Sequence, residues 1–359
     1  MTVFGADVAP VASVRIARAP GRVNLIGDHT DYTGGLVLPM AIDRFTEIRF
    51  TTHPDGVELS SHDEAVDVHL PLVVDDPASI EPAWGRYVAG VVSEVRPNRG
   101  IRGHVSTTIP IGAGLSSSAA LEVAVALALG HDGSALEVAQ LCQRAENRAS
   151  GVPSGIMDQL AIAAGVAGHA LVIDCGELTV EPTPVPDGID IVVQFVAHRT
   201  LVGSPYADRV AECAAAERAI GPLRHATAAQ AASIDDPVVR ARAMHVVNEN
   251  QRVRDFAAAL AAGDLRSAGA LMMRSHDSLR DLFHTSTPAM DAAVAQLTGM
   301  PGVYGARMTG GGFGGCVVAL TEPGALSDGW VVHAVDGARV LTEAEAGDGG
   351  NDSEGDVLR

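Results

Sequence analysis

The sequence contains no lysine, so all 25 basic residues among its 359 are arginines. Three classes of enzyme require a lysine: the P-loop nucleoside triphosphatases, the protein kinases and the enzymes that form a Schiff base with pyridoxal phosphate. The composition excludes all three. If the protein uses a nucleotide, it must bind the phosphates with arginine, backbone amides and a metal ion.

Positive charge of any kind is scarce, because 44 acidic residues outweigh the 25 arginines and leave a net charge of −19. A surface of this sign repels the phosphates of nucleic acids and the headgroups of anionic lipids. We therefore expect neither nucleic-acid nor membrane partners. With 47% hydrophobic and 19% charged residues, the chain is too apolar to be disordered. Its length predicts about two domains.

Cysteine is also rare, and Cys142, Cys175, Cys213 and Cys316 are far apart in the chain. Such spacing is typical of buried thiols in a reducing compartment and not of a disulfide framework or a zinc site. The N-terminus lacks the basic and apolar regions of a secretory signal, and no uncharged apolar run approaches the roughly 18 residues of a membrane span. We expect a cytoplasmic protein.

Hydrophobic periodicity predicts strands and helices in alternation in the first half of the chain and mostly helices in the second. The first strand should end at Pro20-Gly21, and Ser134 with Glu137 forms a capping-box pattern at the start of one helix. The Pro-rich segment 181–188 is the candidate domain boundary. The expected strands cover residues 13–19, 46–52, 102–109, 171–175, 189–197, 303–309 and 316–320, and the expected helices cover 84–95, 119–129, 134–148 and most of 206–297.

Residues 20–39, PGRVNLIGDHTDYTGGLVLP, concentrate polar and ionisable side chains among glycines that favour turns. Asp28, His29 and Asp31 fall within four positions. Carboxylates and imidazoles bind pairs of sugar hydroxyls, so the pattern suits a polyol. The same residue types are also metal ligands, and a polar turn with a helix cap would need no ligand at all.

Residues 109–120, IPIGAGLSSSAA, join an expected strand to an expected helix. Small residues let a ligand approach the backbone closely, and the amides at a helix N-terminus attract phosphate. The hydroxyls of Ser116, Ser117 and Ser118 could bind phosphate oxygens or a magnesium ion. A tight turn with a serine cap would give the same pattern.

The glycine cluster 310–315, GGGFGG, matches the G-x-G-x-x-G spacing of dinucleotide-binding proteins. It is followed by the strand-like CVVAL, whereas that fingerprint must open a helix. We interpret the cluster as a loop that lies close to a ligand or to another backbone. Elsewhere, Asp158 follows a Pro/Gly loop, where it could act as a general base or stabilise a helix start.

In this order, the segments resemble the galactokinases of the GHMP small-molecule kinase family. GRVNLIGDHTDYTGGLVLP resembles the galactokinase signature, PIGAGLSSSAALEVA the phosphate loop and GARMTGGGFGGCVV the third motif. The resemblance implies an α+β fold with two lobes, a ribosomal-protein-S5-domain-2-like lobe at the N-terminus and a ferredoxin-like lobe at the C-terminus. The active site would lie in the cleft between them. The family binds ATP without a Walker lysine, in agreement with the composition.

The resemblance implies ATP- and magnesium-dependent phosphorylation of galactose at its C1 hydroxyl, the first step of galactose utilisation. Asp158 matches the catalytic aspartate that takes the proton from this hydroxyl, and Arg22 matches the arginine that stabilises charge during the transfer. Ser118 and Glu146 match the magnesium ligands. The positions that match sugar contacts are Asp28, His29, Asp31, Gly155, Asp158 and Tyr206, and those that match the nucleotide site are Trp84, Tyr87, Gly112, Ala113, Gly114, Leu115, Ser116, Ser117 and Ser118.

Three departures from the galactokinase pattern concern the sugar site. Most galactokinases have glutamate in place of Asp28, an Asn/Ser-rich strand end in place of residues 193–195, and paired arginines where this chain has Arg209 and Val210. These changes leave open a sibling kinase that acts on N-acetylgalactosamine or arabinose. A non-catalytic sensor of galactose and ATP is the alternative from another class. The segment 112–118, which we call the serine loop, keeps Ser116, Ser117 and Ser118, and this favours an active enzyme over a sensor.

We predict an N-terminal lobe over residues 1–188, a C-terminal lobe over 189–345 and a disordered acidic tail over 346–359. The expected ligands are a small-molecule sugar and ATP with Mg²⁺. We expect the protein to act as a monomer.

Overall fold

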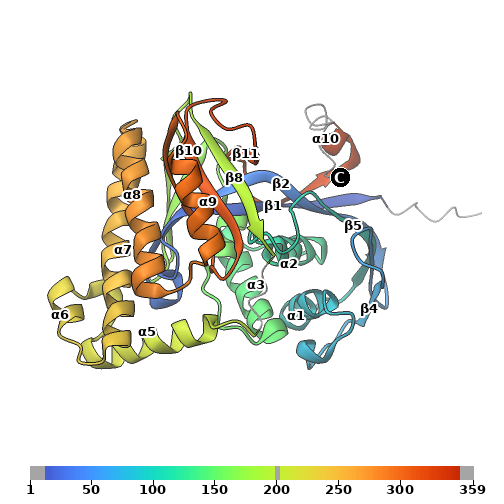
Figure 1. Cartoon of the computed structure of the whole chain (residues 1–359). Helices are drawn as coiled ribbons and strands as arrows, with labels where there is room; N and C mark the ends of the chain where they lie inside the picture. Colours follow the sequence, from blue (N-terminus) through green and yellow to red (C-terminus); the bar gives the residue numbers. More distant parts are fainter. Residues whose placement is uncertain (1–12, 199–202, 348–359) are drawn as a thin grey trace, which may run out of the picture.

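The computed structural model describes residues 13–198 and 203–347, which form an α+β fold built on two β-sheets (Figure 1). The first sheet has the order β12-β1-β2-β5-β3-β4, and β6 joins it through β2 and carries β7 in a hairpin. The second sheet has the order β11-β8-β10-β9. The predicted α+β class is confirmed.

The predicted strands and helices are present with shifted ends, and the structure adds strands at 56–61, 68–71, 179–184, 330–332 and 339–342 and helices at 157–164 and 343–347 that were not predicted. The strands are β1 (Arg15–Ile26), β2 (Leu36–His53), β3 (Gly56–Ser61), β4 (Val68–Pro71), β5 (Gly100–Thr107), β6 (His169–Asp174), β7 (Thr179–Pro184), β8 (Asp190–Ala197), β9 (Val303–Met308), β10 (Gly315–Thr321), β11 (Trp330–Val332) and β12 (Arg339–Thr342). The α-helices are α1 (Gly85–Val95), α2 (Ser117–Ala128), α3 (Ala135–Ser150), α4 (Met157–Ala164), α5 (Tyr206–Ile220), α6 (Ala228–Ala232), α7 (Pro237–Ala261), α8 (Leu265–Ser278), α9 (Pro288–Thr298) and α10 (Glu343–Gly347). Short 3₁₀ turns cover Asp31–Thr33, Pro77–Ser79 and Leu223–His225, and a π-helical turn covers Leu279–Phe283.

The first strand is longer than its sequence predicts. The prediction that it ends at Pro20 was wrong, because β1 continues to Ile26 and its pairing with β2 shifts register between Pro20 and Gly21. A β-bulge interrupts the hydrogen-bonding ladder, so a proline without an N–H is tolerated there. The continuation carries Arg22 and Asn24 into the interior, where they are 2% and 0% exposed.

Helices α1 to α4 form a layer against the first sheet. Helix α2 packs on β1 and β2 and also contacts the other three helices, which explains its almost uniformly apolar sequence. The predicted capping box is present at the start of α3, where Ser134 and Glu137 satisfy each other's backbone N–H groups. Both α2 and α4 contact β1. The loops that precede these two helices therefore approach the same strand.

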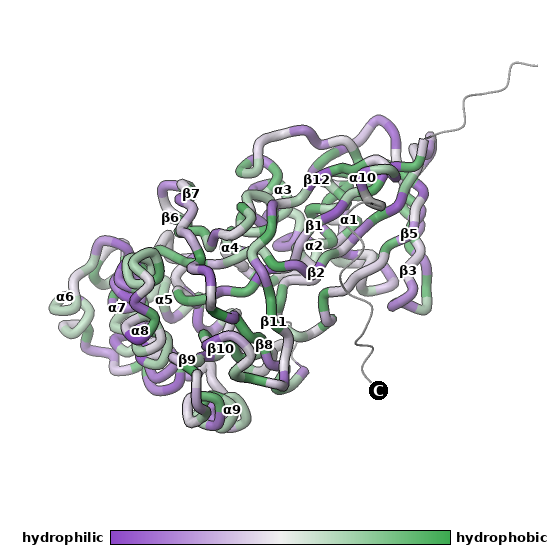
Figure 2. Tube along the Cα trace, turned by 90° about the horizontal axis from the view of Figure 1, so that it is seen from above, coloured by the Kyte–Doolittle hydropathy of each residue, from purple (hydrophilic) through white to green (hydrophobic). Residues whose placement is uncertain are grey.

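The second sheet is covered by the helical part of the chain. Helices α8 and α9 pack on β9, and α7 lies along α8 (Figure 1). Figure 2 shows α5 to α8 gathered at one side of the molecule and β3 and β5 at the other. Helix α7 also contacts β1, β2 and β7 of the first sheet. The largest hydrophobic cluster joins both sheets, since it includes Ile26 and Val318.

The chain crosses from the first sheet to the second between β7 and β8. Only the last part of the predicted link 181–188 is a connection, because residues 181–184 pair with β6. Strand β12 returns to the first sheet and pairs with β1, so the end of the predicted C-terminal lobe extends the N-terminal sheet. The predicted tail 346–359 lies outside the described residues, apart from two positions that end α10.

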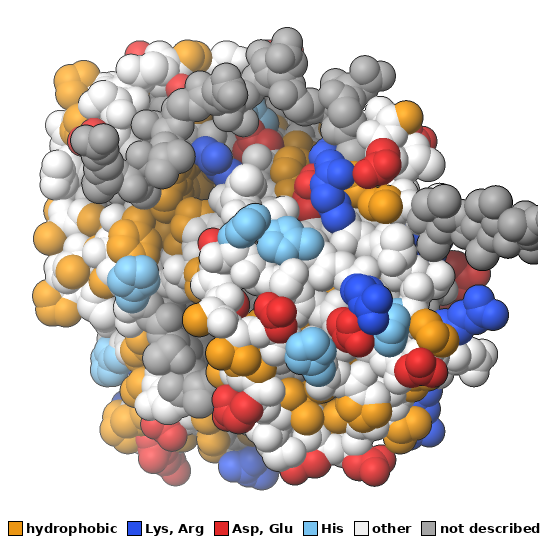
Figure 3. Space-filling view, turned by 90° about the vertical axis from the view of Figure 1, so that its right-hand side faces the viewer, with side chains coloured by type: hydrophobic (Ala, Val, Ile, Leu, Met, Phe, Trp, Pro, Cys, Tyr) orange, Lys and Arg blue, Asp and Glu red, His pale blue; other side chains and the backbone are white. Residues whose placement is uncertain are grey.

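The remaining whole-molecule observations concern cysteines, membrane spans and charge. All four cysteines are buried and none is in a disulfide, as their spacing predicts. Within the described part of the chain, no helix combines the length and the apolar character needed to cross a membrane. On the side of the molecule at the right of Figure 1, acidic and arginine side chains are interspersed with histidines and apolar groups (Figure 3).

Candidate active site

The two residues predicted to be catalytic are joined by a bidentate ion pair. Arg22 on β1 donates from Nε to Asp158 Oδ1 at 2.8 Å and from Nη2 to Oδ2 at 2.7 Å. Arg22 is buried, whereas 29% of the Asp158 side chain is exposed, in the first turn of α4. A guanidinium in this position favours the ionised carboxylate. Asp158 therefore presents a charged, partly exposed carboxylate to a ligand in the adjoining pocket.

The serine loop wraps around this pair. Arg22 Nη1 donates to the carbonyl oxygen of Gly114 at 2.7 Å, and Ser116 Oγ donates to Asp158 Oδ2 at 2.5 Å. Gly112, Gly114 and Ser116 all have left-handed backbones, with φ of 75°, 81° and 64°. These angles turn the chain tightly into α2, which begins at the next residue. Ala113 and Leu115, which were also predicted to contact the nucleotide, are each 1% exposed and are not among the residues that line the pocket beside this loop.

Glu146 on α3 faces the start of α2. Its Oε1 accepts a hydrogen bond from Ser118 Oγ at 3.3 Å, and its Oε2 accepts from Ser154 Oγ at 3.2 Å and from Gln159 Nε2 at 2.7 Å. Burial, and next the charge of Asp158, raise the pKa of Glu146 above its usual value. The surroundings of Glu146 thus disfavour the negative charge of its carboxylate.

Such a site fits a magnesium ion that also binds phosphates. Within the described ranges, no three His, Cys, Asp or Glu side chains converge to hold a metal by themselves. Magnesium bound to a nucleotide commonly takes only one or two carboxylates from the protein, with phosphate oxygens and waters as its other ligands. Ser118 and Glu146 supply one hydroxyl and one carboxylate of this kind.

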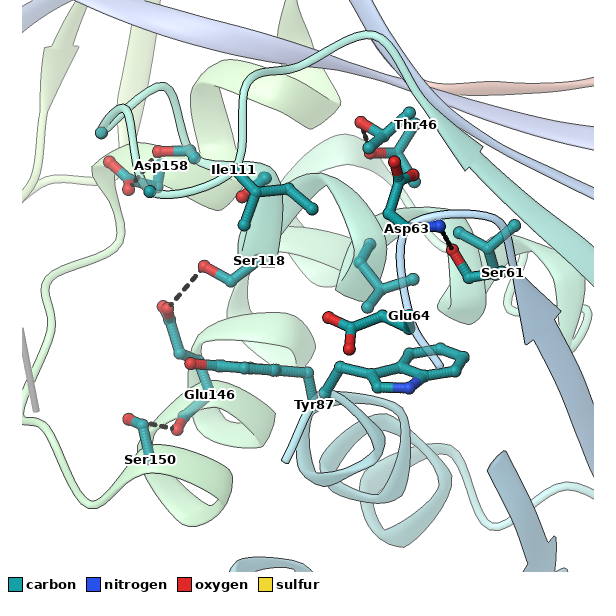
Figure 4. Close-up of a pocket in the computed structure, with 18 of the residues that line it drawn as sticks. Thr46, Ser61, Asp63, Glu64, Tyr87, Ile111, Ser118, Glu146, Ser150 and Asp158 are labelled. Atoms are coloured by element: carbon teal, nitrogen blue, oxygen red, sulfur yellow. Dashed lines mark hydrogen bonds between the residues drawn. The ribbon is translucent and has the colours of Figure 1, made fainter. Parts of the chain in front are cut away.

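A pocket of about 360 Å³ extends from Asp158 along the serine loop to Trp84 and Tyr87 (Figure 4). Trp84 Nε1 donates to the carbonyl oxygen of Val66 at 3.0 Å, which fixes the indole at the pocket wall. Burial, and next the charge of Glu146, raise the pKa of Tyr87 to about 12, so its hydroxyl stays protonated. Several further polar residues line the wall without having been predicted, because no motif marks them, namely Thr46, Ser61, Asp63, Glu64 and Thr107.

His29 lies at the centre of a cluster of aromatic rings. Its ring lies 5.4 Å from that of Tyr206 and 4.7 Å from that of Phe283. Nδ1 is 2.9 Å from the Tyr32 hydroxyl, and Nε2 is 3.3 Å from the carbonyl oxygen of Gly311. Because both ring nitrogens are engaged within the protein, the alternative that this segment binds a metal through His29 is disfavoured.

Asp31 and Gly155 are in direct contact. A β-carbon on Gly155 would lie 2.0 Å from Asp31 Oδ2, so only glycine leaves room for this carboxylate. Burial, and next the charge of Asp158, raise the pKa of Asp31 to about 7. The sequence placed these three residues in one site, and the structure brings them together.

Asp28 is enclosed, and polar groups of the protein surround its carboxylate. It is 1% exposed, its Oδ2 is 2.7 Å from Nη2 of the fully buried Arg307, and its Oδ1 accepts from Asn24 Nδ2 and from the backbone N of Gly310, both at 3.0 Å. Burial raises the pKa of Asp28, and Arg307 opposes this shift. Sequence reasoning missed Arg307. It lies three positions before the glycine cluster, which is the signal that could have drawn attention to it.

The glycine cluster is the loop between β9 and β10 and lies against the signature segment. It supplies the amide of Gly310 to Asp28 and the carbonyl oxygen of Gly311 to His29. At Gly312 a β-carbon would lie 2.4 Å from the carbonyl oxygen of Thr285. The interpretation as a closely packed loop, and not a dinucleotide fingerprint, is confirmed.

A second hollow, of about 440 Å³, is lined in part by Asp31 and Gly155. Its lining also includes Gln143 on α3 and Val210 on α5. Val210 stands where the galactokinase pattern has an arginine. This departure therefore lies directly beside the predicted sugar contacts.

Comparison with known proteins places these features in one family. The chain matches three family models: the galactokinase galactose-binding signature over residues 2–50, the GHMP kinase N-terminal domain over 86–166 and the GHMP kinase C-terminal domain over 256–328. It is 40% identical to the galactokinase of Homo sapiens over 94% of each chain. It is 43% identical to the galactokinase of Roseiflexus sp. (strain RS-1) over 86% of this chain and 83% of the relative.

Solved structures agree with the sequence comparison. The crystal structure of Lactococcus lactis galactokinase complexed with galactose has a TM-score of 0.85 and 31% sequence identity, over 91% of this chain and 95% of that chain. A mevalonate kinase structure, with a TM-score of 0.63 and 21% identity over 86% and 92% of the two chains, shares the fold. The implied two-lobed GHMP kinase fold is confirmed.

Proposed function

Since this chain belongs to the galactokinases of the GHMP kinase family, we propose that Asp158 and Arg22 carry out the chemical step of a galactokinase. The enzyme is a transferase of galactose metabolism, and its reaction is the ATP-dependent phosphorylation of α-D-galactose at the C1 hydroxyl. The observation that carries the proposed mechanism is the bidentate Arg22–Asp158 pair at the mouth of the nucleotide pocket.

Asp158 acts as the general base. Its carboxylate accepts the proton of the C1 hydroxyl while the C1 oxygen forms a bond to the γ-phosphorus and the bond to the β,γ-bridging oxygen breaks, releasing ADP. Arg22 keeps the carboxylate ionised and oriented through two hydrogen bonds. Phosphoryl transfer depends mainly on positioning and charge neutralisation, which a fixed guanidinium supplies at no cost of reorganisation.

The serine loop binds the phosphates. The left-handed turns at Gly112 and Gly114 lead into the N-terminus of α2, where free backbone amides and the helix dipole favour negative charge. Ser116, Ser117 and Ser118 line the same pocket and can donate hydroxyl hydrogen bonds. This arrangement accounts for phosphate binding in a chain without lysine. Trp84 and Tyr87 form the adenine end of the pocket.

Ser118 and Glu146 would hold the magnesium ion. The metal, when bound, neutralises the charge that develops on the phosphate oxygens. The chain's own contribution is to keep the Ser118 hydroxyl and the Glu146 carboxylate on the same side of the pocket as the serine loop.

The proposed sugar contacts are His29, Asp31, Gly155 and Tyr206, together with Asp158. Asp28 belongs to the same predicted set, but it is 1% exposed and its carboxylate faces protein groups. Asp31 can accept hydrogen bonds from adjacent hydroxyls, and the rings of His29 and Tyr206 supply an apolar face. The enclosure of Asp28 by Arg307 gives it a second role, which is to fix the signature segment. The hollow beside Val210 favours one further candidate substrate, a galactose with a larger substituent such as N-acetylgalactosamine.

We further propose that the enzyme is a cytoplasmic monomer whose partners are the sugar and ATP, without nucleic-acid or membrane partners. The net charge of −19 supports the exclusion of nucleic acids and anionic membranes. The division of the chain into lobes at residue 188 is likewise a proposal, supported by the change of sheet between β7 and β8.

The test is a coupled ADP-release assay with magnesium-ATP over free sugars. The panel contains galactose, N-acetylgalactosamine, arabinose, glucose and galactose analogues altered at C2 or C6. We expect turnover with galactose well above that with glucose. Val210→Arg serves as the matched variant, because it fills the second hollow and should reduce any turnover of N-acetylgalactosamine more than that of galactose. Absence of turnover with every sugar, in a preparation that binds ATP, would contradict the proposed function.

A further inference from the structure

One buried carboxyl group close to the active site has no role in the mechanism above. Glu122 lies in α2 and is 0% exposed, within an otherwise apolar helix. Its Oε1 has no hydrogen-bond partner among the described residues. Burial, and next the charges of Glu146 and Asp158, act on this group and raise its pKa well above the usual value. A group this costly to bury calls for a physical reason.

Glu122 is connected to the proposed metal ligand through one amide. Gln159 follows Asp158 in α4 and is 0% exposed. Its Nε2 donates to Glu146 Oε2 at 2.7 Å and to Glu122 Oε2 at 3.3 Å. An amide nitrogen has two N–H donors, so a side chain between two carboxyl groups can give one hydrogen to each. Glu122 on α2, Glu146 on α3 and Gln159 on α4 thus meet in one contact.

This contact bears on the orientation of Glu146. Metal-binding carboxylates depend on hydrogen bonds from neighbouring groups that hold them in the ligating rotamer. The Gln159 amide provides the shortest of the three hydrogen bonds that reach Glu146, and the other two come from serine hydroxyls at 3.2 and 3.3 Å. The acceptor oxygens of Glu122 and Glu146 both favour the orientation in which the amide nitrogen faces them, because a flipped amide would point its oxygen at both carboxyl groups.

We propose that Glu122 is a positioning residue for the metal site: it orients the amide of Gln159, which in turn orients Glu146 toward the nucleotide pocket. The inference rests on the proposed role of Glu146 as a magnesium ligand. The positioning role requires a hydrogen-bond acceptor oxygen at residue 122, and it does not require a charge there.

The test measures metal binding directly. Mn²⁺ is titrated, with detection by electron paramagnetic resonance, into the full-length protein saturated with a non-hydrolysable ATP analogue. Glu122→Leu removes the acceptor while keeping a similar size, and we expect a Kd for Mn²⁺ about 10- to 100-fold higher, the usual effect of losing such a supporting contact. Glu122→Gln keeps an acceptor oxygen without the charge, and its Kd should stay within about threefold of that of the wild type.

Two further variants separate positioning from general damage to the fold. Gln159→Met removes the connecting donor and should weaken Mn²⁺ binding as Glu122→Leu does, and the double variant should be no weaker than either single one. Val123→Ala removes buried volume from the neighbouring position of α2, where the side chain is 0% exposed. It should lower the unfolding temperature without changing the Kd for Mn²⁺. The Kd for galactose, measured by calorimetry, should be unchanged in the four single variants and in the double variant.

Several outcomes would overturn the positioning role. Glu122→Leu with the wild-type Kd would do so, as would Glu122→Gln with a loss equal to that of Glu122→Leu, because the effect would then come from charge. Additive losses in the double variant would show that the two residues act separately. If the wild type binds no Mn²⁺, the metal role of Glu146 fails and the positioning role with it. Galactose-dependent ADP release by the same protein, assayed separately with ATP, would leave the phosphoryl-transfer proposal standing.

Discussion

Removal of the Arg307 guanidinium would isolate a carboxylate that the fold has enclosed. Arg307 and Asp28 are 0% and 1% exposed, and their ion pair at 2.7 Å joins the second sheet to the signature segment that follows β1. Breaking a buried pair on one side costs about 3–5 kcal/mol, because the remaining charge cannot recover its hydration. Asp28 retains two donors, Asn24 and Gly310, so we expect Arg307→Met to lose about 3 kcal/mol, the lower end of this range.

The assay is urea-induced unfolding followed by fluorescence. The two tryptophans, Trp84 and Trp330, report on the helix layer of the first sheet and on the second sheet, respectively. The double variant Asp28→Asn with Arg307→Met should recover much of the loss, since neither charge then remains buried. Arg280→Met is the matched control: Arg280 pairs with Asp277 and Asp281 at the surface, and its loss should cost less than about 1 kcal/mol. A free energy of unfolding for Arg307→Met within 1 kcal/mol of the wild-type value would refute the reasoning.

Three further predictions concern ligand binding. Because the pKa of Asp31 is raised to about 7, its ionised, hydrogen-bond-accepting form is lost as the pH falls through 7. The KM for galactose should therefore be roughly tenfold higher at pH 6 than at pH 8, and Asp31→Asn should abolish this dependence. Gly155→Ala should raise the KM for galactose at least about tenfold and leave that for ATP unchanged, because its β-carbon would displace Asp31; unchanged kinetics would argue against the contact. Trp84→Ala should weaken ATP binding, followed by calorimetry, by about 1–3 kcal/mol without affecting galactose, whereas equal losses for both ligands would point to a general distortion.

Much of the fold could be predicted from sequence, and the exceptions have physical causes. Helix positions followed from apolar periodicity, and the capping box at Ser134 is a local pattern that needs no tertiary contact. The end of β1 was misjudged because Pro20 breaks a regular strand but not a bulged one. A bulge depends on the partner strand, which local sequence does not reveal.

In the candidate site, too, the residues within local motifs could be predicted and those that depend on tertiary contacts could not. Arg22, Asp158 and the serine loop lie in recognisable segments, and the structure brings them into hydrogen-bond contact. Arg307 and Gln159 were missed because their importance arises from pairings across 279 and 37 positions of the chain, with Asp28 and Glu122 respectively. Glu122 offered a local signal of its own, as the one charged residue in a largely apolar helix.

The proposed chemical role of Asp158 is tested most directly by Asp158→Ala, assayed for galactose-dependent ADP release and for ATP binding. The serine loop and its helix N-terminus remain in this variant, so the Kd for ATP should stay within about threefold of that of the wild type. Loss of the base should lower kcat by about 100-fold or more. Asp158→Asn, which keeps a hydrogen-bonding group beside Arg22, controls for disorder in the loop and should be equally slow. Wild-type turnover in either variant would contradict the role of Asp158 as the base.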